Sequence, residues 1–253
     1  MPGPLKYPRR RARAGPARLA VLLWWLAALA GASAPLDFHD YYAGALEAAR
    51  QRHLADTNDT AAAWQLGRAC FDLGEFAPNA TERAVLATQG IAVCRDLVAR
   101  QPDCAPAHYY LALNLGQLAR TRSLSALKLV KEMEHHFHLA RKLDEQFSHA
   151  GPDRSLGLLY RDAPGWPASI GSKAKARQHL LRALQLSGAY PENQLNWTET
   201  LLEWGDAKAA QARLKELQTV LATNRVALTG DFWAASWTDW DKRWLSLTNR
   251  LGP

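Results

Sequence analysis

The sequence predicts an all-α protein in which about four helical hairpins stack into a right-handed solenoid. One observation is a short helical motif that recurs along the 253 residues, beginning at Leu66, Leu111, Leu156 and Trp197. Another is the amphipathic segment that follows each copy, with an apolar residue every three or four positions. No run of alternating apolar and polar residues predicts a β-strand. Since each hairpin of a solenoid contacts mainly its neighbours, a chain of this length needs no single large core.

The recurring motif matches the first helix of a tetratricopeptide repeat. Its copies read WQLGRAC, YYLALNL, LGLLY and NWTETLL. In such a repeat a small residue lets the second helix approach closely, and a large residue three positions later fills the gap. The copies begin 45, 45 and 41 residues apart, whereas the ideal period is about 34. We expect the extra residues in the turns FAPNATER, ARTRSLS and DAPGWPASIGS. The alternative is generic packing of helical hairpins with a chance similarity.

Local signals set the expected boundaries of these elements. Pro164, Gly165 and Pro167 end one helix, and Ser172 is placed to cap the next. The sequence therefore predicts an N-terminal helix within residues 33–57, the repeat domain over 58–223 and a C-terminal capping helix within 224–253.

The predicted capping helix carries tryptophans at steps of four, three and four residues, at Trp233, Trp237, Trp240 and Trp244. On a helix they form one aromatic stripe. A solenoid needs a cap over its last repeat, and this is the favoured interpretation. The alternative is a surface for a partner or a membrane interface.

The N-terminus predicts a secretory signal peptide over residues 1–32. Residues 1–34 hold six basic residues and no acidic one, so the rest of the chain has 25 basic and 24 acidic residues. The apolar run LAVLLWWLAALA, followed by Ala30-Gly31-Ala32, is typical of a cleaved leader. It falls short of the roughly twenty apolar residues that span a bilayer, so an uncleaved membrane anchor is the weaker alternative. We expect export, with the periplasm as the compartment, and no nucleic-acid partner, because the basic character lies in the leader.

Export allows the cysteines to be oxidised. Cys70 and Cys94 occupy positions that face each other within the first predicted hairpin, so they form a candidate disulfide. In the alternative both are reduced and pack as small apolar residues. Cys104 is left over and is a second candidate partner for Cys94.

The sequence contains no constellation that predicts an enzyme or a cofactor. The cluster EMEHHFH, with His135, His136 and His138, lacks the spacing of a known metal motif, so a solvated helix face is favoured over a metal site. No pairing of a nucleophile with a base is apparent.

The predicted functional surface is the concave groove of the solenoid, lined by outward positions of each first helix. These positions are Trp64, Arg68, Phe71, Tyr109, Tyr110, Leu113, Gln117, Arg154, Leu158 and Arg161, with Asn196, Glu199 and Glu203 at the acidic end. Such a groove suits an extended peptide, a partner protein or an amphipathic ligand with an anionic head. In particular, we expect Arg154 and Arg161 to hold a carboxylate beside Tyr109 and Tyr110. A merely solvated face is the alternative.

Residues 60–220 resemble the T-component family of TRAP transporters, most specifically in LGLLYRDAPGWP and the following KARQHLLRAL. The resemblance implies an exported tetratricopeptide-like accessory protein that associates with a solute-binding protein, forms a homo-oligomer and carries a cavity for small hydrophobic ligands. The leader ends in AGASA without a cysteine, unlike lipoprotein members. The competing function is a generic envelope or secreted scaffold for protein-protein interaction, with no ligand.

Overall fold

The computed structural model describes residues 36–122 and 126–252. Regular structure in these ranges is helical, apart from an isolated bridge between Gly165 and Gly171. The candidate signal peptide lies outside the described residues. None of the described helices combines the length and the apolar character needed to cross a membrane.

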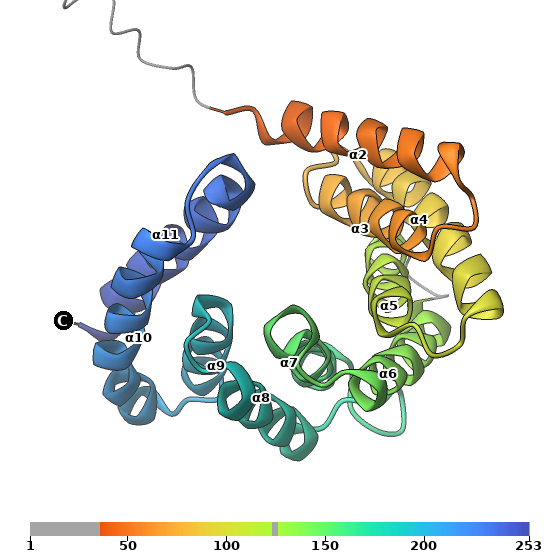
Figure 1. The fold of residues 1–253 in the computed structure, drawn as a ribbon. Helices are drawn as coiled ribbons and strands as arrows, with labels where there is room; N and C mark the ends of the chain where they lie inside the picture. Colours follow the sequence, from red (N-terminus) through yellow and green to blue (C-terminus); the bar gives the residue numbers. More distant parts are fainter. Residues whose placement is uncertain (1–35, 123–125, 253) are drawn as a thin grey trace, which may run out of the picture. The chain divides into compact units, whose positions relative to one another are not determined.

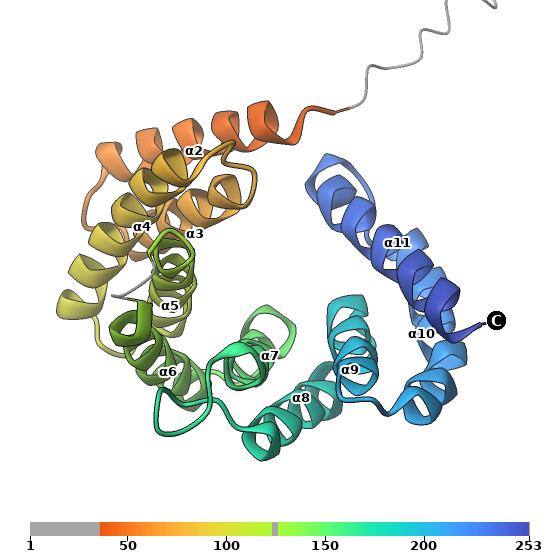
Figure 2. The ribbon, with the colours of Figure 1, turned by 180° about the vertical axis from the view of Figure 1, so that it is seen from behind.

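The described helices succeed one another along the chain as α2 (Phe38–Ala55), α3 (Thr60–Glu75), α4 (Ala80–Arg100), α5 (Ala105–Ala119), α6 (Ala126–Leu143), α7 (Phe147–Asp162), α8 (Lys173–Ser187), α9 (Pro191–Glu203), α10 (Ala207–Ala227) and α11 (Asp231–Leu251). The pairs α3/α4, α5/α6, α7/α8 and α9/α10 are the four predicted hairpins. Within residues 36–252 the first helices of the pairs lie along the inside of an arc and the second helices along its outside (Figures 1 and 2). The predicted all-α helical-repeat solenoid is confirmed.

The small residue of the motif is where the two helices of a hairpin meet most closely. A Cβ added to Gly157 would overlap the side chain of Leu180 in α8, and one added to Gly67 would overlap Cys94 Sγ in α4. Tyr160, three positions after Gly157, is buried in the same core as Leu156. In this chain, as the repeat pattern predicts, the small residue of the motif lets the paired helices approach closely, and the larger residue packs in the core beside it.

The extra residues of the first repeat lie elsewhere than predicted. Only residues 76–79 separate α3 from α4, and α4 is 21 residues long, because Asn79 caps it and ATER forms its first turn. The third repeat does have a long turn, over residues 163–172. There Ser172 caps α8 as expected, accepting a hydrogen bond from the backbone N–H of Lys175 at 3.3 Å.

The tryptophan stripe of α11 packs against the last repeat. Trp237 and Trp240 are buried in a cluster with Leu195 of α9 and Leu214 and Leu217 of α10. The indole N–H of Trp240 donates to Glu192 Oε2 at 2.7 Å. α10 runs to Ala227, so the predicted boundary between repeats and cap, at residue 223, falls inside α10 rather than between helices.

The candidate disulfide between Cys70 and Cys94 is not formed. All three cysteines are free thiols, with Cys70 and Cys94 buried. Cys94 Sγ instead occupies the space over Gly67, one turn before Cys70, where the glycine leaves room for it. Both thiols act here as small apolar side chains of the core.

Candidate functional site on the concave face

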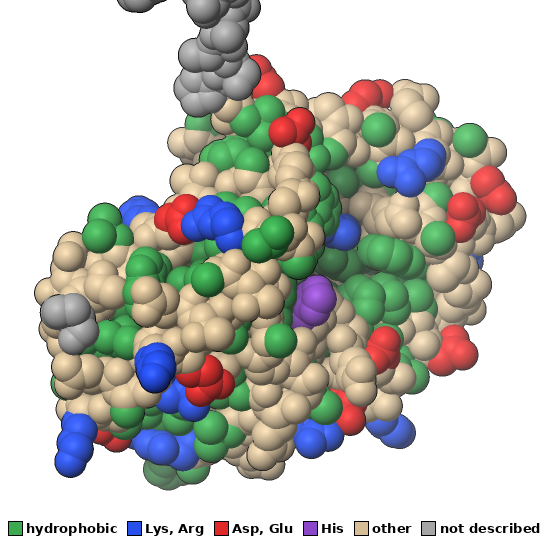
Figure 3. Space-filling view, turned by 60° about the vertical axis from the view of Figure 1, so that its left-hand side comes forward, with side chains coloured by type: hydrophobic (Ala, Val, Ile, Leu, Met, Phe, Trp, Pro, Cys, Tyr) green, Lys and Arg blue, Asp and Glu red, His purple; other side chains and the backbone are tan. Residues whose placement is uncertain are grey.

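Three cavities lie on the inner side of the arc. The aromatic cavity, of about 360 Å³, is lined from α2, α3, α5, α7 and α11 and by Tyr190. The apolar cavity, of about 380 Å³, lies where α3, α5, α6 and α7 meet. The central cavity, of about 610 Å³, is lined by residues of α2, α3, α5, α7, α9 and α11 and shares residues with both of the others. Figure 3 shows a hollow in the surface with hydrophobic side chains gathered in it.

Leaving aside the acidic end, the structure places nine of the ten predicted groove residues in the walls of these cavities. Trp64, Arg68 and Tyr110 line the aromatic cavity. Phe71, Leu113, Gln117 and Leu158 line the apolar cavity. Tyr109 and Arg154 line the central cavity. The tenth, Arg161, lines none of the three; its guanidinium pairs with Asp162 and Glu203 and donates to Thr200.

The predicted carboxylate clamp of Arg154 with Arg161 does not form. Arg154 is 8% exposed, and NH1 donates to His149 O and to Asn193 Oδ1, both at 3.0 Å. NH2 donates to Ser148 O at 3.2 Å. Ser148, His149 and Ala150 have φ of 53°, 56° and 59°, a left-handed conformation that is costly for residues other than glycine. Arg154 therefore stabilises this left-handed turn of α7 instead of presenting its guanidinium to a ligand.

The aromatic cavity contains several residues that the repeat positions did not predict. Besides the three predicted residues and Asp72, which occupies another outward position of the first repeat, it is lined by Tyr42, Phe147, Ser148, His149, Tyr190, Phe232, Trp233 and Ser236. Trp64 and Tyr110 stack in parallel at 5.9 Å between centroids, and the Phe147 ring stands perpendicular to both. Phe147 reaches this place because the left-handed turn follows it, and no sequence signal marked that turn.

α11 forms one wall of the groove as well as capping the last repeat. The guanidinium of Arg68, in α3, lies 5.0 Å from the ring centroid of Phe232, in α11. Ser236 lines both the aromatic and the central cavity. The N-terminal half of the capping helix therefore faces the first repeat across the groove.

A partly buried charge network holds α11 against α9. Arg243 donates to Glu192 Oε1 and Glu199 Oε2, both at 2.7 Å, and to Asn196 Oδ1 at 2.6 Å. Burial raises the pKa of Glu192, but the charges of Arg243 and Arg154 outweigh it and hold this pKa below its usual value. The predicted acidic end of the groove, at Asn196 and Glu199, is thus engaged by a residue of the cap.

A second polar network ties α6, α7 and α8 together. Asp153, fully buried, accepts from Arg141 Nε at 2.9 Å and pairs with His179 Nδ1 at 2.7 Å. The ring of Tyr160 stacks on that of His179, with centroids 5.5 Å apart, and its hydroxyl donates to Glu134 at 2.5 Å. Buried polar groups are stable when their partners are within reach, and these partners come from three different helices.

The histidine cluster of α6 forms a contact with α5. His108 Nε2 lies 2.9 Å from Pro102 O, which can only accept, so this nitrogen carries the proton. In its neutral form His108 Nδ1 therefore accepts from His136 Nδ1, at 2.8 Å. Among the described residues no group of three or more His, Cys, Asp or Glu side chains is arranged to hold a metal ion.

The His108–His136 contact predicts a pH-dependent stability. Burial and the neighbouring His108 lower the pKa of His136 from 6.5 to about 4. The folded chain then binds fewer protons at this site than the unfolded chain between these values, so its contribution to stability, fully present above about pH 6.5, is lost as the pH falls towards 4. Urea unfolding at pH 7 and pH 5 should show a smaller difference for His136→Gln than for the parent. If the free energy of unfolding changed equally with pH in both proteins, His136 would not be the cause of the pH dependence.

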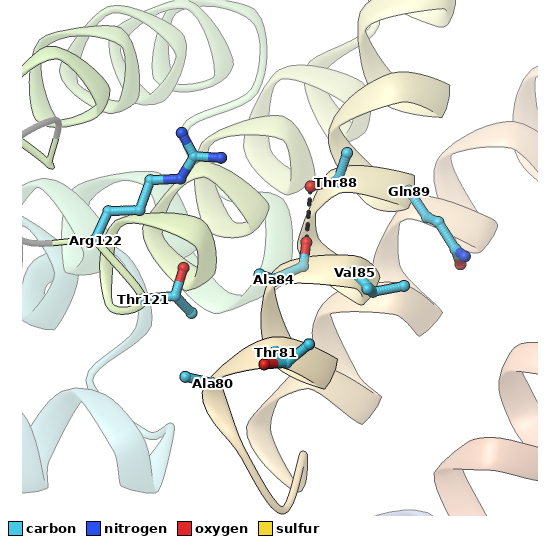
Figure 4. Close-up of a pocket in the computed structure, with 8 residues that line it drawn as sticks. All are labelled: Ala80, Thr81, Ala84, Val85, Thr88, Gln89, Thr121 and Arg122. Atoms are coloured by element: carbon cyan, nitrogen blue, oxygen red, sulfur yellow. Dashed lines mark hydrogen bonds between the residues drawn. The ribbon is translucent and has the colours of Figure 1, made fainter.

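A further groove, of about 590 Å³, lies outside the concave face, along α4 and the end of α5 (Figure 4). It is lined mainly by small or uncharged residues such as Ala80, Ala84 and Thr88, and Arg122 stands at its edge. The hydroxyl of Thr88 is used within the helix, donating to Ala84 O at 2.7 Å. With few polar groups directed into it, this groove offers less for recognition than the three concave cavities.

Residues 36–150, less than half of the chain, match the family model described as regulator of microtubule dynamics protein 1-3. No curated protein matches the chain. Among solved structures, TTC0263, a thermophilic tetratricopeptide-repeat protein of Thermus thermophilus, is 20% identical, with a TM-score of 0.63 over 91% of this chain and 95% of that one. MamA is 16% identical, with a TM-score of 0.51 over 76% of this chain and 98% of its own. At these identities the similarity shows the fold alone, and that fold is the tetratricopeptide-like helical repeat.

Proposed function

We propose that this protein is a binding scaffold that holds a segment of a partner protein in its concave groove. The observation that carries the proposal is the row of three cavities whose walls come from every repeat and from both flanking helices. Concave pockets with apolar walls and a few directed polar groups are the usual form of a binding site. The tetratricopeptide-like fold supports protein-protein interaction as the role of this face.

The shape of the groove favours an extended or helical polypeptide over a compact ligand. The apolar cavity offers Leu113, Met133 and Phe137 to a hydrophobic side chain, with Gln117 and Arg120 at its rim. The central cavity continues from it, because Phe71, Leu113 and Leu158 belong to both. A segment that follows this path would bury side chains in successive pockets.

Filling the groove should weaken binding without unfolding the chain. Leu158 is half-buried and lines two cavities, so Leu158→Trp occupies the space that a ligand side chain needs. On an array of random octapeptides with blocked termini, we expect Leu158→Trp to bind at least about tenfold more weakly than the parent, the effect of one lost apolar anchor. Val226→Trp, at an 82% exposed position of α10, is the matched control and should bind like the parent. Equal binding by all three proteins would contradict the groove as the site.

A more specific role rests on the resemblance to the T-components of TRAP transporters. We propose on that basis that the partner is a solute-binding protein and that the chain is exported by residues 1–32. The most specific part of this resemblance, from Leu156 to Leu184, lies outside the range that matches the microtubule-regulator family, whose name instead suggests a cytoskeletal partner. Sequencing the N-terminus of the protein from its native host tests the export: a chain that begins at Met1 would contradict it.

A further inference from the structure

Arg68 is the charged group of the aromatic cavity that keeps donors available. Its Nε donates to Asp72 Oδ2 at 3.2 Å. Within the described residues, NH1 and NH2 of Arg68 have no hydrogen-bond acceptor from the protein. A guanidinium carries five N–H donors in a planar fork that matches a carboxylate. Arg68 therefore has unused donors beside the cavity, whereas those of Arg154 are directed to the turn of α7.

The surroundings of Arg68 should strengthen a hydrogen bond from its guanidinium to a ligand carboxylate. Aromatic rings form most of the wall, among them Trp64, Tyr110, Phe147 and Phe232. A second guanidinium, that of Arg154, lies 5.5 Å from the ring centroid of Tyr190, another wall residue. Arg154 donates to the neutral oxygens His149 O, Asn193 Oδ1 and Ser148 O rather than to a carboxylate. Charge-assisted hydrogen bonds gain strength where neighbouring rings exclude water.

Asp72 is the carboxylate that competes for Arg68. Burial raises the pKa of Asp72 to about 6, although Arg68 lies beside it. The other acidic residues of the adjoining central cavity are already engaged: Glu192 and Asp239 pair with Arg243, and Glu75 pairs with Arg120. A ligand carboxylate would therefore share Arg68 with one poorly solvated acid.

Resting on the segment-binding role proposed above, we infer that the aromatic cavity receives an acidic residue of the bound segment, next to an aromatic or large aliphatic residue, and that Arg68 holds its carboxylate. The unused donors NH1 and NH2 bind the carboxylate, and the rings of Trp64, Tyr110 and Phe232 cover the neighbouring side chain. The alternative is that Asp72 holds a basic residue of the segment. The cavity would then select basic instead of acidic segments, and the experiment below distinguishes the two.

The experiment uses the full chain on the same array of random octapeptides with blocked termini. The parent should select octapeptides enriched in Asp or Glu beside an aromatic or large aliphatic residue. For the strongest of these, Arg68→Gln should weaken binding at least about tenfold, as expected for lost hydrogen bonds to a charged group. Arg52→Gln removes an exposed arginine of α2 that bonds to Gln65, away from the cavities, and should bind like the parent.

Asp72→Asn decides the sign of the preferred charge. This variant lacks the acid that shares Arg68, so acidic octapeptides should bind to it more tightly than to the parent. If the site instead held basic residues, basic octapeptides would bind to it more weakly than to the parent. Thermal unfolding identifies any variant whose loss of binding comes from loss of fold.

The remaining outcomes separate this inference from the proposed function. Binding without enrichment in acidic residues, or enrichment that persists in Arg68→Gln, overturns the role of Arg68 and leaves the groove as the site. Failure of the parent to bind any octapeptide contradicts segment binding itself, and this inference with it.

Discussion

Replacing Arg243 with alanine should lower the free energy of unfolding by about 3 kcal/mol, the lower end of the cost of leaving a buried acid without its partner, because the side chain of Glu192 is 25% exposed. Arg243 is the common donor for Glu192, Glu199 and Asn196. Without it the partly buried carboxylate of Glu192 keeps only the indole N–H of Trp240 and the more distant charge of Arg154. Urea unfolding followed by circular dichroism measures the change.

A control variant distinguishes this network from ordinary surface charge pairs. Arg95 pairs with Glu132 where both side chains are partly exposed, so Arg95→Ala should cost no more than about 1 kcal/mol. If Arg243→Ala were as mild as Arg95→Ala, the network would not be what holds α11 to α9. Tryptophan fluorescence should also report the change, because Trp240 loses the fixed position of its hydrogen-bond acceptor.

Replacing Arg154 with methionine should destabilise the fold by about 3 kcal/mol or more. The substitution keeps an apolar side chain of similar length but leaves Ser148 O and Asn193 Oδ1 without this donor. Each buried acceptor left unpaired costs about 1–3 kcal/mol, and the left-handed turn at residues 148–150 loses what stabilises it. Urea unfolding of Arg154→Met against the parent measures the loss.

Arg161→Ala is the control for this prediction, because it lies two turns further along the same helix. Its guanidinium pairs with Asp162 and Glu203, whose side chains are about half exposed. We expect a smaller loss than for Arg154→Met. If both variants unfolded like the parent, Arg154 would be free to serve a ligand, as its position in the repeat first indicated.

The fold was predictable because its signals are local. The spacing of Leu66, Leu111 and Leu156 sets the repeat, and Gly67 and Gly157 mark where paired helices touch. The same register identified Phe71 and Leu158 as inward-facing, because every first helix of a solenoid presents the same positions to its concave side.

The rest of the site depends on contacts between segments far apart in the chain. Phe147 and His149 enter the aromatic cavity through three consecutive left-handed residues, none of them glycine, which no propensity predicts. Phe232 enters it because α11 approaches the first repeat, a question of tertiary packing. The role of Arg154 was misassigned for the same reason: its backbone position faces the groove, but the nearby turn takes its donors.

The contact between Arg68 and Phe232 changes how the array should unfold. In a linear array each unit depends on its neighbours, so the ends fray first and the loss spreads inward. Here Arg68 of the first repeat contacts Phe232 of the terminal helix, so fraying at either end of the array breaks a contact that also stabilises the other end. The two ends are thereby coupled, and opening one of them weakens the other. The array should consequently lose its structure in a more concerted transition than an open row of the same repeats.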